Sequence, residues 1–318
     1  METTPEQIPF LDLWEASDDD EGMSDERWKE ACREVRDACE KFGCFVVRPY
    51  DGVPRDVVEG LFRSMKPLFD LPLETKKKNT NPKPYFGYAG DSQVVPLYES
   101  FGVENATDLD ASETFTKLMW PQGNPQFCQS LNSTSRKLLE LEMTIRKMVF
   151  DSFGIGNQFD SHVRNTNSTL RVMKYKASPT SETAIGLLAH TDKNILTILC
   201  EDEPGLQVQS KRGDWIYLSP PKGSFIVIVG ESLKVWSNGR FHAAKHRVVM
   251  NDRERYSCGL FSIPNDGWIM EVPAEMADTQ HPLLFKPFNF TEYISFFYSK
   301  VDKPKENTVE AFAGISVN

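Results

Sequence analysis

The sequence lacks the features that define several common classes of protein. No stretch approaches the ~20 consecutive apolar residues that a membrane span requires, so no membrane association is expected. The chain carries 36 Lys and Arg against 46 Asp and Glu, a formal net charge of -10, whereas duplex nucleic acid is bound by basic surfaces. Nucleic acid is therefore not an expected partner either.

Cysteine is scarce and shows no metal-binding or redox pattern. The six cysteines of this 318-residue chain have no Cys-x-x-Cys spacing and lie mostly within apolar patterns, which predicts buried free thiols in a reducing compartment. The first 26 residues contain no apolar run, so a signal peptide is not expected. Repeats and Gly-rich phosphate loops are also missing. We therefore expect a soluble, cytoplasmic protein.

Apolar periodicity predicts helices in the first half of the chain and short strands in the second. Residues 25–42, 54–69 and 133–153 carry apolar side chains at helical spacing. After Phe159 short apolar runs alternate with Gly, Pro, Asp and Asn, as is typical of sandwiches and barrels. The expected strands are 170–175, 195–200, 206–209, 215–218, 225–229, 247–250 and 256–263. A final helix is expected at 290–298.

These elements predict a mixed, mainly β fold: a double-stranded β-helix, or distorted jelly roll, flanked by α-helices. We expect an N-terminal helical and strand region at 1–160 that packs on the core. The jelly-roll core follows at 161–265, and a C-terminal segment with a helix at 266–318 covers the site.

Two of the five histidines and one aspartate are spaced as metal ligands. His190 and Asp192 lie two positions apart, so on an extended strand both side chains point to one face. His246 belongs to a strand distant in sequence that we expect to be adjacent in space. Two imidazoles and one carboxylate form the triad that suits non-haem Fe(II) and leaves coordination positions open. A His-x-Asp pair alone also arises by chance, so the predicted metal site depends on the further residues that accompany the pair.

An anion-binding pair accompanies the predicted triad. Arg255 and Ser257, nine and eleven positions after His246, lie on the next predicted strand, where alternation turns both inward. A guanidinium can hold a carboxylate through two parallel hydrogen bonds, and a hydroxyl can add another. Arg253 is the rival anion ligand, although no serine follows it two positions later.

Residues that contact a substrate carry no motif. The aromatic residues between 87 and 125 follow no clear period, and most are expected to pack in the core. Phe115, Lys117 and Met119 are the candidates from this region for a pocket wall. Phe261 lies on the same face of its strand as Ser257 and is a further candidate, with core packing an equal alternative.

The chain resembles the plant 2-oxoglutarate- and Fe(II)-dependent dioxygenases over nearly its whole length. The segments that carry the resemblance are 8–13, 38–47, 71–88, 190–192, 205–208, 236–240, 246–248 and 255–257. Judged by His190-Thr191-Asp192-Lys193-Asn194 and the Ile-Leu-Thr that follows, the chain resembles most the branch that contains the dioxygenases producing alkenyl and hydroxyalkyl glucosinolates.

The resemblance implies an Fe(II) centre with 2-oxoglutarate as cosubstrate, O2 as oxidant and ascorbate as a supporting reductant. The implied Fe(II) ligands are His190, Asp192 and His246. The distal carboxylate of 2-oxoglutarate would meet Arg255 and Ser257, and Tyr175 would hydrogen-bond the cosubstrate. Met173 stands where many members have an asparagine that helps to hold 2-oxoglutarate.

The implied activity is oxidation of a small plant specialised metabolite, with succinate and CO2 as coproducts. Hydroxylation is expected, and desaturation, ring closure or O-/N-demethylation are variants of the same step. Two alternatives stay open: an oxidase that uses the triad without 2-oxoglutarate, and a non-catalytic protein that binds a small ligand on the same scaffold. The oligomeric state is also open, with a monomer as the working expectation.

Overall fold

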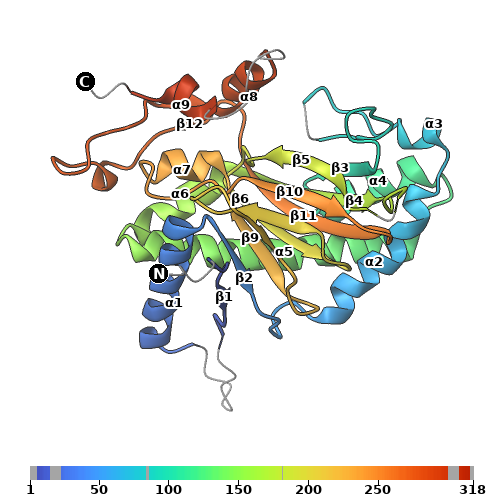
Figure 1. The fold of residues 1–318 in the computed structure, drawn as a ribbon, viewed down its shortest axis with the longest axis horizontal. Helices are drawn as coiled ribbons and strands as arrows, with labels where there is room; N and C mark the ends of the chain where they lie inside the picture. The colour runs from blue at the N-terminus through green and yellow to red at the C-terminus, as the bar shows by residue number, and fades with distance from the viewer. Residues whose placement is uncertain (1–5, 15–22, 84–85, 181, 300–307, 316–318) are drawn as a thin grey trace.

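Two β-sheets form the core of the protein. The computed structural model describes residues 6–14, 23–83, 86–180, 182–299 and 308–315. The larger sheet has seven strands in the order β1-β2-β9-β6-β11-β4-β3, and the smaller has four in the order β5-β10-β7-β8. Together they form the expected jelly roll with helices around it (Figure 1).

The strands of the larger sheet are β1 (Phe10–Leu11), β2 (Cys44–Val47), β3 (Tyr98–Glu104), β4 (Thr166–Tyr175), β6 (Leu196–Glu201), β9 (Phe225–Val229) and β11 (Arg255–Pro264). Those of the smaller sheet are β5 (Ala184–His190), β7 (Leu206–Gln209), β8 (Trp215–Tyr217) and β10 (His246–Met250). A separate pair consists of β12 (Ile269–Met270) and β13 (Phe288–Asn289).

The helices are α1 (Asp25–Lys41), α2 (Arg55–Phe69), α3 (Leu73–Lys76), α4 (Leu109–Met119), α5 (Pro125–Ser152), α6 (Phe159–Arg164), α7 (Glu231–Trp236), α8 (Phe290–Ser299) and α9 (Thr308–Ala313). Two 3₁₀ turns lie at Gly156–Gln158 and Ala274–Met276. Among the residues described, no helix is long and apolar enough to cross a membrane.

The larger sheet is buried on both faces. Strand β9 shows this most clearly, because all five of its residues are buried. Phe225, Val227 and Val229 belong to the core cluster under the helices. Ile226 and Ile228 belong to the cluster between the two sheets. A strand covered on both faces is apolar throughout, which is why this segment could be predicted as a strand to its exact ends.

Helix α5 supports the face of the larger sheet opposite the smaller one (Figure 1). Leu138, Leu141 and Ile145 of its predicted stripe are fully buried. The helix begins eight residues before the predicted start at Ser133. The reason is its cap: the Asn124 side chain accepts the backbone N–H of Phe127 at 3.1 Å, and a proline follows the cap.

Helix α4 was not predicted, because polar residues share its buried face. The Ser112 hydroxyl donates to the carbonyl of Ala106 at 2.8 Å, and the Thr116 hydroxyl donates to the carbonyl of Ser112 at 2.7 Å. Both side chains are buried. Their hydrogen bonds to the backbone permit the burial but obscure the apolar period.

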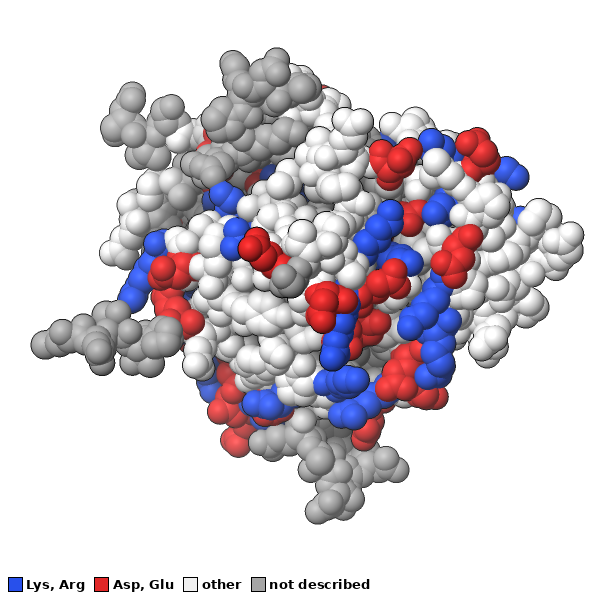
Figure 2. Space-filling model, turned by 45° about the vertical axis from the view of Figure 1, so that its right-hand side comes forward, with Lys and Arg blue, Asp and Glu red and all other residues white. Residues whose placement is uncertain are grey.

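The C-terminal helices α8 and α9 lie side by side at the top of the view in Figure 1, above α7. The helix predicted at 290–298 is confirmed as α8. All six cysteines are buried free thiols, as predicted. On the face seen in Figure 2, acidic and basic side chains are interspersed, so that face offers no extended basic surface.

Candidate metal and cosubstrate site

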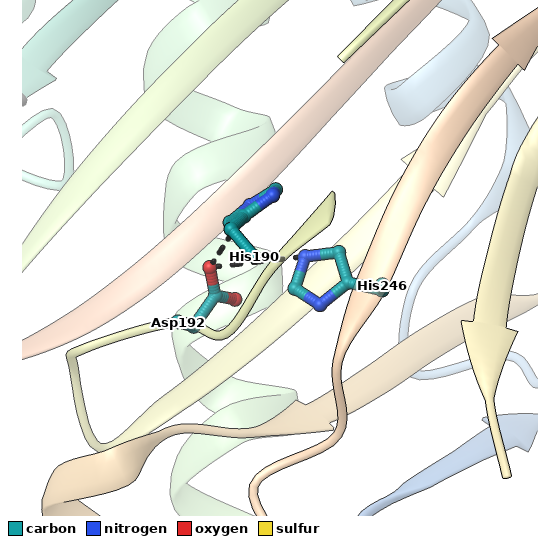
Figure 3. Close-up of side chains that lie close together, drawn as sticks. All are labelled: His190, Asp192 and His246. Atoms are coloured by element: carbon teal, nitrogen blue, oxygen red, sulfur yellow. Dashed lines mark ion pairs between the residues drawn. The ribbon is translucent and has the colours of Figure 1, made fainter. Parts of the chain in front are cut away.

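Strand pairing in the smaller sheet brings the two predicted histidine ligands together. His190 is the last residue of β5 and His246 is the first of β10, and the two are direct partners in the antiparallel ladder. Their ring centroids are 4.3 Å apart. Asp192 was predicted to lie on the same strand as His190, but it lies in the loop after β5. Its carboxylate nevertheless faces both rings (Figure 3).

The three side chains form a compact ligand set. The Oδ1 atom of Asp192 is 3.8 Å from Nε2 of His190 and 3.9 Å from Nε2 of His246. One ligand atom from each residue lies within 4.8 Å of the other two. Two nitrogens and one carboxylate oxygen around one point suit Fe(II) and leave the remaining coordination positions to other ligands. The residues present therefore fit the implied metal.

Backbone carbonyls set the tautomer of both histidines. Nδ1 of His190 lies 2.8 Å from the carbonyl of Leu188, and Nδ1 of His246 lies 3.0 Å from that of Ala244. A carbonyl only accepts, so each Nδ1 carries the proton and each Nε2 presents its lone pair to the site. Burial and the neighbouring His246 lower the pKa of His190 to about 4, which keeps this ring in the neutral form that a metal requires.

Thr197 of β6 orients the carboxylate of Asp192. Its hydroxyl donates to Oδ2 of Asp192 at 2.7 Å, and the side-chain amide of Asn194 donates to the Thr197 oxygen at 3.1 Å. Thr197 is fully buried. Because Oδ2 is held in this way, Oδ1 is directed toward the histidines.

We expect Thr197→Val to lower the affinity for Fe(II) by about 10- to 100-fold, the usual cost of losing a contact that orients a ligand. Valine keeps the shape and removes the donor. Anaerobic Fe(II) titration measures the change. Thr169→Val is a matched control, because Thr169 is equally buried and its hydroxyl has no hydrogen-bonding partner in the described part of the chain. Equal affinities in the two variants would contradict this role.

The ligand set opens into a cavity of about 1490 Å³ between the two sheets. Alternate residues of two neighbouring strands form one wall: Asn167, Thr169, Arg171, Met173 and Tyr175 of β4, and Arg255, Ser257, Phe261 and Ile263 of β11. Helix α8 contributes Phe290, Ile294 and Phe297. Pockets for one small ligand usually measure ~300–1,000 Å³, so this cavity has room for a cosubstrate and a substrate together.

Arg255 lines this cavity, and hydrogen bonds hold its guanidinium in a fixed orientation. Its Nε donates to the carbonyl of Glu203 at 3.0 Å, its Nη1 donates to the Ser257 hydroxyl at 3.2 Å, and its Nη2 donates to the carboxylate of Glu201. A guanidinium has five N–H groups. These contacts use one on each nitrogen, and the Tyr175 side chain also hydrogen-bonds the guanidinium, so one N–H group is left for a ligand carboxylate. The guanidinium also lies 4.9 Å from the ring centroid of Tyr175.

The rival anion ligand and three of the four candidate pocket residues lie outside the cavity. Arg253 has a side chain that is 70% exposed and pairs with Glu203 at 3.7 Å. Helix α4 buries Phe115 and Met119 in the helical core and turns Lys117 to the surface, where it pairs with Glu113 at 2.9 Å. Phe261 does line the cavity.

Sequence reasoning missed Thr197, Arg171 and Glu201. Arg171 could have been found, because alternation along β4 places it on the same face as Met173 and Tyr175. The roles of Thr197 and Glu201 depend on the pairing of β6 with β11 and on a loop conformation, which no local pattern specifies.

Comparison with known proteins agrees with this geometry. Residues 166–264 match the model of the 2OG-Fe(II) oxygenase superfamily, and residues 8–134 match that of the non-haem dioxygenase in morphine synthesis N-terminal region. The rice dioxygenase for auxin oxidation has a similar structure, with a TM-score of 0.80 and 27% identity over 97% of this chain and 100% of that one. An Arabidopsis thaliana counterpart bound to 2-oxoglutarate has a TM-score of 0.76 and 26% identity over 87% of this chain and 100% of its own.

The fold and the ligand set thus define a non-haem oxygenase that uses Fe(II) and 2-oxoglutarate. A curated relative, "Probable 2-oxoglutarate-dependent dioxygenase AOP1" of Arabidopsis thaliana, is 38% identical over 316 residues, which cover 96% of each chain. The "2-oxoglutarate-dependent dioxygenase AOP2" of the same plant is 27% identical, with 98% of each chain covered. The chain belongs to the 2OG-Fe(II) oxygenase superfamily, and its relatives place it near the plant branch predicted from its sequence.

Proposed function

We propose that this dioxygenase hydroxylates a small, largely apolar molecule that carries an acidic group. The observation that carries the proposal is a second arginine in the cavity. Arg171 is buried, and its guanidinium donates to the Ser100 hydroxyl and contacts the carbonyl of Gly87 at 3.5 Å. A guanidinium forms a stronger, charge-assisted hydrogen bond with a carboxylate than with a neutral acceptor, so an acidic group on the substrate would suit this position.

The two arginines are far enough apart to serve two ligands. Arg255 pairs across the sheet with Tyr175, and Arg171 pairs with Gly259. These pairs are four residues apart along β4, or about 14 Å at the usual rise of a strand. We therefore assign the Arg255 end to 2-oxoglutarate and the Arg171 end to the substrate.

In this arrangement each part of the site has one task. His190, Asp192 and His246 would hold Fe(II). Arg255 and Ser257 would hold the distal carboxylate of 2-oxoglutarate. The apolar side chains of α8 would exclude water from the cavity. When bound, Fe(II) and 2-oxoglutarate would supply the oxygen-activating chemistry, in which one atom of O2 ends in succinate, formed with CO2 from 2-oxoglutarate, and the other hydroxylates a C–H bond of the substrate.

Substrate acidity can be tested by comparing small apolar plant acids with their methyl esters as stimulants of succinate formation. We expect acids to stimulate and the matching esters to fail. Arg171→Met should raise KM for a stimulating acid by about 10- to 150-fold, the equivalent of one lost charged hydrogen bond of ~1.5–3 kcal/mol, and leave KM for 2-oxoglutarate unchanged.

The control for this test is Arg164→Met, which removes an exposed arginine outside the cavity and should behave as the wild type does. Equal stimulation by acids and esters would contradict an acidic substrate. An unchanged KM in Arg171→Met would remove Arg171 from the substrate site.

A further inference from the structure

Glu201 is a buried carboxylate on the guanidinium that we assign to 2-oxoglutarate. The side chains of Arg255 and Glu201 are 3% and 6% exposed. One oxygen of Glu201 accepts from Nη2 of Arg255. The other oxygen is buried and has no hydrogen-bonding partner among the residues described. Glu201 is also the direct ladder partner of Ser257, so the acid and both members of the anion clamp lie on one face of the sheet.

The charges at this place balance only while the cosubstrate is absent. One guanidinium then faces one carboxylate. The distal carboxylate of 2-oxoglutarate would bring a second negative charge to the same cation. Two carboxylates that share one site cannot both stay ionised without cost, so the pKa of one of them rises. An uncompensated charge in a buried place is also unfavourable in itself.

The surroundings of Glu201 favour the neutral acid. Burial raises the pKa of Glu201 in the free protein, although the charge of Arg255 opposes this rise. Asp202, the next residue, adds negative charge. Tyr217 of β8 is close enough for Glu201 to raise its pKa, after burial as the larger cause. The positive charge of Lys66 in α2 lowers the pKa of Asp202, against the larger effect of burial. Arg255 is thus the cation that Glu201 and the distal carboxylate of 2-oxoglutarate would share.

We propose that Glu201 takes up a proton from solvent when 2-oxoglutarate binds, so that a neutral acid and the distal carboxylate share Arg255. This inference rests on the assignment of 2-oxoglutarate to Arg255. In the complex the pKa of Glu201 is higher than in the free protein, so the complex is favoured at low pH. Between the two pKa values the affinity for 2-oxoglutarate falls by up to about tenfold for each unit that the pH rises. Glu201 acts here as a positioning residue.

Anaerobic calorimetry of the Fe(II)-loaded protein measures the proton directly. 2-Oxoglutarate is titrated in buffers of different ionisation enthalpy, and the dependence of the heat on the buffer gives the protons taken up. We expect the wild-type protein to take up roughly one proton more than the Glu201→Gln variant, because the amide keeps an acceptor for Arg255 but cannot titrate. We also expect the affinity of Glu201→Gln to depend less on pH.

Two controls isolate the effect. Glu203→Gln removes the neighbouring carboxylate, which is 38% exposed and pairs with Arg253, and should match the wild type. 2-Oxopentanoate, which lacks the distal carboxylate, should bind without the extra proton. Equal proton uptake in the wild type and Glu201→Gln would overturn the inference while leaving the proposed site intact. Binding of 2-oxoglutarate that does not depend on Arg255 would overturn both.

Discussion

Asp192→Ala is expected to abolish Fe(II) binding and, with it, succinate formation. Asp192 is the anionic ligand of the set, and the two histidines that remain would hold Fe(II) only weakly. Loss of a contact that merely orients a ligand already costs about 10- to 100-fold in metal affinity or activity, so loss of the ligand itself should cost more. Anaerobic Fe(II) titration and succinate formation measure the two effects separately.

The matched control is Asp278→Ala. Asp278 also lies close to a histidine, His281, with Nδ1 3.0 Å from its carboxylate, but both side chains are more than half exposed and no third ligand joins them within the described part of the chain. This variant should keep wild-type iron affinity and activity. Retention of tight iron binding and full activity in Asp192→Ala would refute the ligand assignment.

Arg255→Ala is expected to weaken 2-oxoglutarate binding by about 30- to 5,000-fold, corresponding to the ~2–5 kcal/mol lost when one member of a buried charged pair is truncated. The KM for the substrate should change far less than the affinity for 2-oxoglutarate. The same variant leaves Glu201 buried without its cation, so the free energy of unfolding should fall by ~3–5 kcal/mol. Anaerobic titration of the Fe(II)-loaded protein and urea denaturation give the two quantities.

A double variant separates binding from folding. Arg255→Ala combined with Glu201→Ala removes both buried charges, so stability should recover while 2-oxoglutarate affinity stays low. Arg253→Ala, two positions earlier on the surface, should leave both unchanged. If Arg253→Ala weakened 2-oxoglutarate binding and Arg255→Ala did not, the anion clamp would have to move to Arg253.

Much of the fold could be predicted because its strands and helices carry regular apolar patterns. Helices α1 and α2 and the strands β7 and β9 follow their predicted positions closely, whereas α5 begins eight residues before its predicted start. Helix α4 could not be predicted in the same way, since Ser112 and Thr116 lie on its buried face and satisfy their hydroxyls with backbone carbonyls. Helix propensity and apolar periodicity predict a helix poorly where a local hydrogen bond allows a polar residue to be buried.

In the candidate site, too, some residues could be predicted from local sequence patterns and others could not. His190, Asp192 and His246 could be proposed from residue type and spacing, and Arg255 and Ser257 from alternation on one strand. The pocket residues could not, because the walls of a cavity come from segments that only the tertiary fold brings together. Phe115 and Met119 pack under the sheet, whereas Phe290, Ile294 and Phe297 of α8 enter the cavity wall.

The most direct test of the account is succinate formation from 2-oxoglutarate by the anaerobically Fe(II)-loaded protein after O2 is admitted, with a panel of small plant acids. The account predicts succinate that requires iron, rises with a particular acid and is matched by the hydroxylated product. Consumption of O2 without succinate would indicate an oxidase that does not use 2-oxoglutarate. Bound iron with neither O2 consumption nor succinate would indicate a binding protein, and either result would contradict the account.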